Sequence, residues 1–231
     1  TREAVLPTIV SRCQVVPFRH IPSSEAAGIL SQKTGVTAQQ ARIAIEACNG
    51  SITRAMVFAK SAERSEFRAR VMEVLSNLEL SDPRDVLEYA AELIERSKAP
   101  LDNVRTQQSE ELAESADFLT KSALKQIELR HKRTLTMATK ESLGQMTSII
   151  RSWLRDVLMI VSGTPDLVIN VDQKEALERA AQRVSYAGIM SALREAYRTD
   201  EALSYNVSPE TCLDALLFSI REVLHGSGNP H

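Results

Sequence analysis

The chain has 231 residues, of which 43% are hydrophobic and 25% charged, and its formal net charge is −2. This balance is typical of a globular protein with one or two domains, and the near-neutral charge excludes a strong overall attraction to nucleic acid or to acidic membranes. No apolar run approaches the roughly 20 residues of a membrane span, and three widely spaced cysteines predict neither a zinc site nor a disulfide framework. These properties favour a reducing cytoplasm.

Residues 6–18, LPTIVSRCQVVPF, differ from everything that follows, because they predict a short β-strand. The run is rich in β-branched residues and is bounded by prolines, which is typical of a strand. A single strand is not stable without a partner strand. We therefore expect the rest of its sheet to lie upstream, so that the chain is a fragment of a longer protein.

Residues 20–62 predict three short helices. Serine and threonine are good N-terminal caps and glycine is a good C-terminal cap, which sets the expected boundaries. The expected caps are Ser23 or Ser24, Thr37 and Ser51, and the expected ends are Gly35 and Asn49-Gly50. A bundle of this size is too small to stand well alone, so we expect it to pack on neighbouring helices.

Residues 63–231 continue helically. The expected helices cover about 67–80, 83–97, 109–138, 141–161, 173–197 and 209–224, with a break at 98–100 and an Asp172 cap for the fifth. Trp153, Leu213 and Leu217 fall on apolar stripes and are expected to lie in the core. Arg155 and Asp156 are adjacent, so we expect each to meet another helix or solvent. The fold class is thus all-α after one residual strand.

Few motifs in the chain carry chemistry of their own. The chain lacks a GxxxxGK[ST] loop and therefore cannot cradle nucleotide phosphates by itself. The basic run of residues 130–133 favours a solvated helix face, with a DNA phosphate contact as the alternative, and aromatic residues for base stacking are missing nearby. The four histidines lack metal-ligand spacing. Two arginines, Arg12 and Arg54, remain as candidates, although each could equally be a solvated residue.

A resemblance to a known protein family favours a functional role for both arginines. Ser11-Arg12-Cys13-Gln14, followed by the NGSITRA run at 49–55, resembles the end of the ATPase core and the lid of bacterial clamp-loader subunits, which are AAA+ proteins. The runs SWLRDVLMI, VINVD and NVSPETCLDALLFSI resemble the collar of delta-prime subunits of DNA polymerase III. Residues 100–145 match that family poorly and look like an added helical hairpin.

The resemblance implies an ATPase-core end at 1–19, a three-helix lid at 20–62 and a helical collar for oligomerisation at 63–231. It implies that Arg12 is an arginine finger acting in trans, with Ser11 and Cys13 setting its geometry, and that Arg54 corresponds to a sensor-2 arginine. The chain would have no active site or cofactor of its own, because ATP and magnesium would be bound by the neighbouring subunit.

The implied partners are the gamma/tau and delta subunits, and, through the complex, the sliding clamp and primed DNA. The implied function is that of a subunit of the DNA polymerase III holoenzyme, a nucleotidyltransferase, in the ATP-driven loader that places the clamp on DNA. Two alternatives stay open. The chain could belong to an ATP-hydrolysing gamma/tau-type subunit, or it could be a helical scaffold unrelated to ATPases.

Overall fold

The computed structural model describes residues 6–225 apart from 11, 15, 17–20, 117 and 206, and it leaves the side chains of residues 7, 10, 103, 115 and 116 undescribed. The described chain is helical, and no strand occurs in it, which confirms the all-α prediction. The elements are α1 (Pro7–Val10), α2 (Ser23–Thr34), α3 (Ala38–Ala47), α4 (Ile52–Lys60), α5 (Ala62–Asn77), η2 (Leu78–Leu80), α6 (Pro83–Ala116), α7 (Lys121–Val161), η3 (Pro165–Leu167), η4 (Val171–Gln173), α8 (Lys174–Arg183), α9 (Tyr186–Ser204) and α10 (Pro209–His225).

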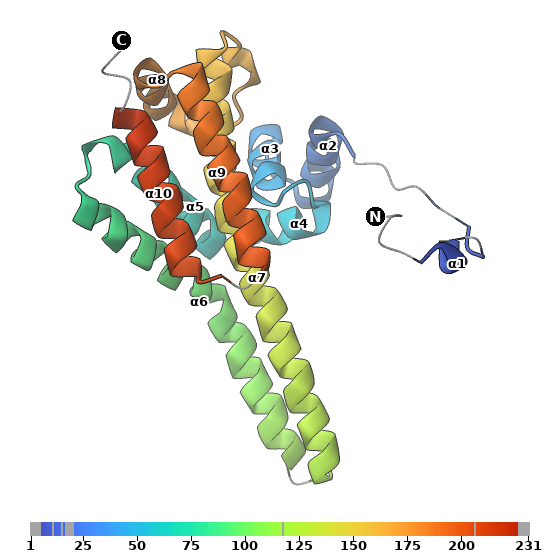
Figure 1. The fold of residues 1–231 in the computed structure, drawn as a ribbon. Helices are drawn as coiled ribbons and strands as arrows, with labels where there is room; N and C mark the ends of the chain where they lie inside the picture. Colours follow the sequence, from blue (N-terminus) through green and yellow to red (C-terminus); the bar gives the residue numbers. More distant parts are fainter. Residues whose placement is uncertain are drawn as a thin grey trace.

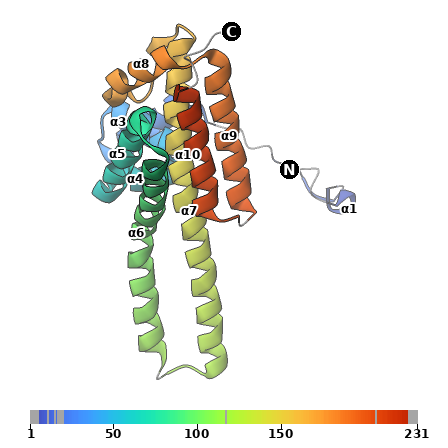
Figure 2. The same cartoon turned by 60° about the vertical axis from the view of Figure 1, so that its left-hand side comes forward.

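The helix α7 is the centre of the architecture (Figure 1), since it packs against α3, α5, α6, α8 and α9. Helix α10 packs across α6 and α9, and α2, α3 and α4 pack on one another. The second half of α6 and the first half of α7 run side by side out of this helical body and form a two-helix arm (Figures 1 and 2). No helix among the described residues has the length and apolarity needed to cross a bilayer.

The predicted strand at residues 6–18 is wrong over its described part. Pro7–Val10 forms the short helix α1, in which the amide of Ile9 donates to the carbonyl of Leu6 at 2.9 Å. β-branched residues favour a strand only where a neighbouring strand accepts their backbone hydrogen bonds. Without that partner the backbone satisfies itself locally, and a proline at the first helical position helps it to do so.

The short helices begin largely where their caps predict. Thr37 forms a capping box with Gln40, and Ser51 accepts a hydrogen bond from the amide of Arg54. Gly35 ends α2 in the left-handed region at a φ of 75°, which suits glycine. Pro22 precedes α2 without any side-chain cap, so the predicted serine cap is wrong there: Ser23 is already helical.

Several predicted helix boundaries in the body are wrong, including the one expected between residues 138 and 141, which α7 crosses without a break. Helix α6 continues through Pro100, and the expected long helix at 109–138 is two helices joined by a turn, with α7 capped by Thr120. The expected helix at 173–197 is also two, because Ser185 caps α9. In the last two cases a periodic apolar pattern runs on across a turn, since successive helices both present an apolar residue every three or four positions. The hairpin expected around 100–145 is confirmed.

The core is continuous from α2 to α10, and it contains Trp153 and Leu217 at 0% exposure and Leu213 at 1%. Trp153 lies on α7, where the central helix meets its neighbours, while Leu213 and Leu217 lie on the inner face of α10. The three-helix unit α2–α4 shares this core, as expected of a bundle too small to stand alone.

Candidate functional site

The two arginines singled out by the sequence are both exposed. Arg12 follows α1, and its backbone amide donates to the carbonyl of Ile9 at 3.1 Å. Arg54 lies in the first turn of α4. Neither guanidinium takes part in an ion pair within the described part of the chain. Cys13 is exposed as well, while Ser11 lies outside the described residues.

Arg54 lines a very small cavity between the α3–α4 turn and α7, together with Cys48, Glu141 and Gln145. Burial raises the pKa of the Cys48 thiol to about 11, so this cysteine stays a neutral thiol. The cavity has too little space for a nucleotide. On its own Arg54 therefore has no ligand site around it.

A buried carboxylate organises the connector between α7 and α8. Asp156 is 0% exposed, and its carboxylate accepts the backbone amides of Ile169 at 3.1 Å and Asn170 at 2.7 Å. The side-chain amide of Asn170 also donates to it at 2.8 Å. Arg155 pairs with it at 3.6 Å, so the expectation that these two adjacent residues do not meet is wrong: the long arginine side chain can fold back to its neighbour.

The same connector is tied to α5 by Arg68. Its guanidinium donates to both carboxylate oxygens of Asp172, at 2.8 and 3.0 Å, and to Asn170 at 2.7 Å. Burial raises the pKa of Asp172, but the hydrogen bonds and charge of Arg68 outweigh that effect and hold this pKa below its usual value. Asp172 was expected to cap a helix, and instead it fixes the connector to α5.

Polar contacts also join the unit α2–α4 to the body. The hydroxyl of Ser148 on α7 donates to the carbonyl of Glu46 at 2.8 Å, and Gln39 on α3 donates to the carbonyl of Ile169. The side-chain amide of Gln145 on α7 donates to the sulfur of Cys48, at the end of α3, at 3.5 Å. These contacts fix α3 against α7 and the connector, so the position of the unit depends on residues about 100 positions away in the sequence.

Two further hollows on this body lie close to the central helix α7. One is a groove of about 310 Å³ between α3, α7 and α9, lined by Arg151, Arg155 and Arg194 among others. Arg151 pairs with Asp200 and lies over the ring of Tyr197, 5.1 Å from its centroid, so its charge is already partnered.

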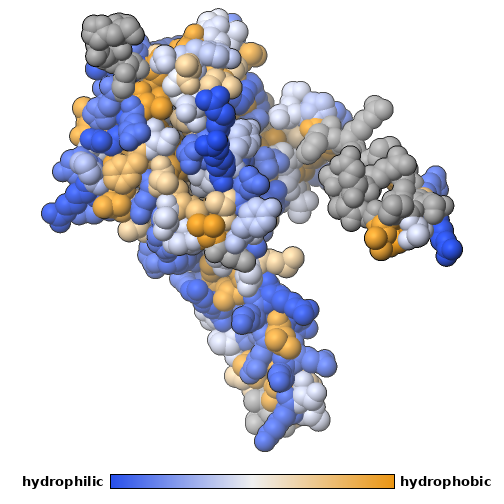
Figure 3. Space-filling model, viewed as in Figure 1, coloured by the Kyte–Doolittle hydropathy of each residue, from blue (hydrophilic) through white to orange (hydrophobic). Residues whose placement is uncertain are grey.

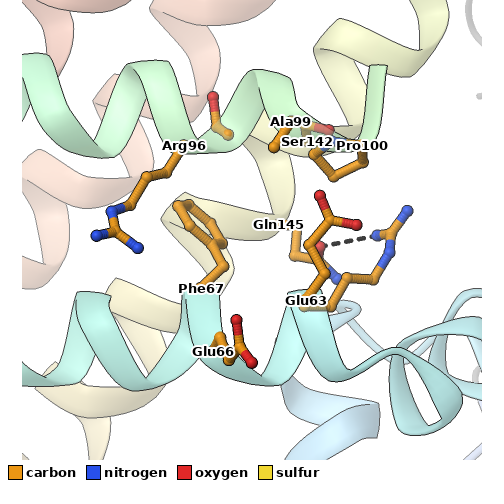
Figure 4. Close-up of a pocket in the computed structure, with 10 residues that line it drawn as sticks. Glu63, Glu66, Phe67, Arg96, Ala99, Pro100, Ser142 and Gln145 are labelled. Atoms are coloured by element: carbon orange, nitrogen blue, oxygen red, sulfur yellow. Dashed lines mark hydrogen bonds between the residues drawn. The ribbon is translucent and has the colours of Figure 1, made fainter. Parts of the chain in front are cut away.

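The other hollow lies between α5, α6 and α7 beside Pro100 (Figure 4), and Phe67 points into it. Its volume is about 90 Å³, which is well below the roughly 300 Å³ of a ligand pocket. The described residues contain no cluster of three or more histidine, cysteine or acidic side chains that could hold a metal ion.

A comparison with known protein families identifies the family of the helical region that carries most of these features. Residues 106–222 match the family described as "DNA polymerase III, delta subunit, C terminal". The chain belongs to this family. It is therefore part of a DNA polymerase III clamp-loader subunit. No curated protein and no solved structure matches the chain.

The delta C-terminal family match runs from the arm of α6 into α10. It includes Asp156, Asn170 and Asp172, the core residues Trp153, Leu213 and Leu217, and the groove arginines. Arg12, Arg54 and the unit α2–α4 lie outside it. The family match thus covers the arm and the helices from α7 into α10, but not α5 or the first half of α6. The arginine assignments rest on the resemblance of the first 55 residues alone.

Sequence reasoning missed the network around Asp156 and Arg68. One local signal pointed towards it, because Asp156 falls three residues after Trp153 and seven after Ile149, on a helix stripe that is otherwise apolar, where a carboxylate is unusual. Its partners could not be found in this way, since Arg68 and Asp172 are 104 residues apart.

Proposed function

We propose that this chain is the lid and collar part of a delta-prime-type clamp-loader subunit. The match of residues 106–222 supports the coarser part of the proposal, which is that the chain belongs to a DNA polymerase III subunit. The body buries a continuous core and would hold the subunit in the loader ring through contacts of its outer helices. The unit α2–α4 is the three-helix lid in this assignment, and residues 63–231 form the collar.

Arg12 supplies an arginine finger in trans. Its guanidinium is exposed and makes no ion pair within the described residues, so it is free to meet an anion on another subunit. An arginine brought to a γ-phosphate stabilises the charge that develops there during hydrolysis. ATP and magnesium are then held by the neighbouring gamma/tau subunit. The assembled loader, with the delta subunit, places the sliding clamp on primed DNA.

The test is Arg12→Ala in the intact subunit, assembled with its loader partners. We expect assembly to be unchanged by size-exclusion chromatography, and DNA-stimulated ATP hydrolysis at the neighbouring site to fall by at least about 100-fold, as for other arginine fingers. Arg84→Ala is the matched control, because Arg84 is an exposed arginine that pairs only with Glu88 on its own helix. Normal hydrolysis in the assembled variant would show that Arg12 is not a finger.

The matched family names the delta subunit, whereas the delta-prime assignment rests on the Ser-Arg-Cys motif and the collar runs. The two positions in the ring can be separated by reconstitution. We expect the intact subunit to restore clamp loading to a loader that lacks delta-prime. Restoration of a loader lacking delta would assign it to delta instead. ATP binding and hydrolysis by the intact subunit alone would favour the gamma/tau type, and failure to join any loader would leave a helical scaffold.

A further inference from the structure

The arm of α6 and α7 separates its charges between its two helices. Residues 102–116 of α6 carry four acidic side chains against one arginine, whereas residues 121–140 of α7 carry six lysines and arginines against one glutamate. The whole chain has a formal charge of −2, so this basic helix is a local feature. In the view of Figure 3 the surface of the arm is largely hydrophilic, with isolated hydrophobic residues.

The two helices of the arm are joined at Glu111. Its carboxylate pairs with Arg130 and with His131, the latter at 2.9 Å, and Gln108 donates to the carbonyl of His131 at 3.3 Å. Hydrogen bonds and charges from His131 and Arg130 hold the pKa of Glu111 below its usual value. Arg130 and His131 of the basic run at 130–133 therefore form ion pairs within the arm, whereas Lys132 and Arg133 do not.

Four cations on α7 remain unpaired. Lys121, Lys125, Lys132 and Arg133 are exposed, and none of their charged side-chain groups takes part in an ion pair or hydrogen bond within the described chain. Intervals of four and seven residues place the three lysines on one face of the helix, and Arg133 flanks them. This basic arm face extends about 18 Å along the helix at 1.5 Å per residue. Glu128 is the one acidic residue on it.

We propose that the basic arm face binds the phosphate backbone of duplex DNA. A row of unpaired cations on a rigid helix matches a backbone that carries one negative charge for about every 1.7 Å of its axis. A duplex is favoured over a single strand, because single-strand binding uses aromatic residues that stack on bases, and the face between Lys121 and Lys140 has none. Such contacts carry no sequence preference, since they reach only phosphates.

This inference stands apart from the arginine-finger assignment, because it uses other residues and can be tested on the 231-residue chain. The probe is a fluorescently labelled 20-base-pair duplex, with binding followed by anisotropy. Four phosphate contacts predict that log K falls with log salt concentration at a slope of about −3.6, which weakens binding by roughly 100-fold between 50 and 200 mM salt. Binding independent of salt, or no binding at 50 mM salt, would overturn the inference.

The decisive variant replaces all four cations, as K121Q/K125Q/K132Q/R133Q. It should weaken binding at 50 mM salt by at least about 10-fold and bring the slope close to zero. A matched control removes four surface cations, three exposed and one (Lys98) half-buried, that each pair with a nearby acid on the same helix. It is R84Q/K98Q/K174Q/R198Q. Equal loss in the two variants would show a general charge effect and refute a site on the arm.

Glu128→Gln tests the same face by a gain of function. Removing the one negative charge among the lysines should tighten duplex binding several-fold, without adding a new contact. Far-ultraviolet circular dichroism checks that the variants keep their helices. If Glu128→Gln leaves the affinity unchanged while the quadruple variant weakens it, the phosphates lie on a different side of α7 and the assigned face is wrong.

Discussion

Asp156 offers the sharpest test of how this body is held together. Its carboxylate is 0% exposed and accepts the amides of Ile169 and Asn170, which are themselves 3% and 1% exposed. In Asp156→Ala both amides lose their acceptor where water cannot replace it. Each unsatisfied buried donor costs about 1–3 kcal/mol, and Arg155 loses its pair as well. We expect the free energy of unfolding to fall by about 3–5 kcal/mol.

The assay is urea unfolding followed by circular dichroism, with the free energy obtained by linear extrapolation. For a chain of this size the expected loss lowers the melting temperature by roughly 10 °C. Asp156→Asn keeps one acceptor oxygen and should lose less. Asp166→Ala is the control, because Asp166 is exposed on the same connector, and it should stay within about 0.5 kcal/mol. A loss below about 1 kcal/mol in Asp156→Ala would refute the account, as would unchanged amide exchange at Ile169 and Asn170.

Two further predictions concern pH and Pro100. The folded-state pKa of Asp172 lies below its usual value, so its pair with Arg68 contributes stability above about pH 4 that is lost as pH falls through the folded pKa. The free energy of unfolding should therefore fall more on acidification in the wild type than in Asp172→Asn. Parallel curves of unfolding free energy against pH for the two proteins would contradict this. Pro100 removes one hydrogen bond from inside α6, so Pro100→Ala should raise the free energy of unfolding, measured by urea denaturation, by about 1–2 kcal/mol. Pro209→Ala is the control, because Pro209 is at the first position of α10, and it should not raise the free energy of unfolding.

The sequence predicts local features of this fold well. The caps at Thr37 and Ser51 and the start of α6 at Pro83 depend on residues at or near the helix end, and these predictions are confirmed. Pro100 shows the limit of such reasoning. Next to it Leu101 is 2% exposed, and the packing of α6 against α7 and α10 keeps the helix continuous despite the lost hydrogen bond.

The candidate site shows the same limit: features that depend on contacts between distant residues could not be predicted from the sequence. The polar network is invisible to periodicity, because Arg68, Asp156 and Asp172 come together only when α5, α7 and the connector pack. The expected strand fails for a related reason, since strand propensity has meaning only with a partner. The resemblance of Arg12 to an arginine finger is a statement about another subunit. No contact within this chain could have revealed it.

Helix α7 is the element that relates these features to one another. At about 60 Å for 41 residues, it carries the basic arm face at its start, the contacts with α3 at Gln145 and Ser148 in its middle, and Asp156 near its end. Because α7 is continuous, a ligand bound to the arm contacts the same helix that positions the unit α2–α4. Residues that fix α7 to its connector therefore also fix the frame in which the arm and this unit are held.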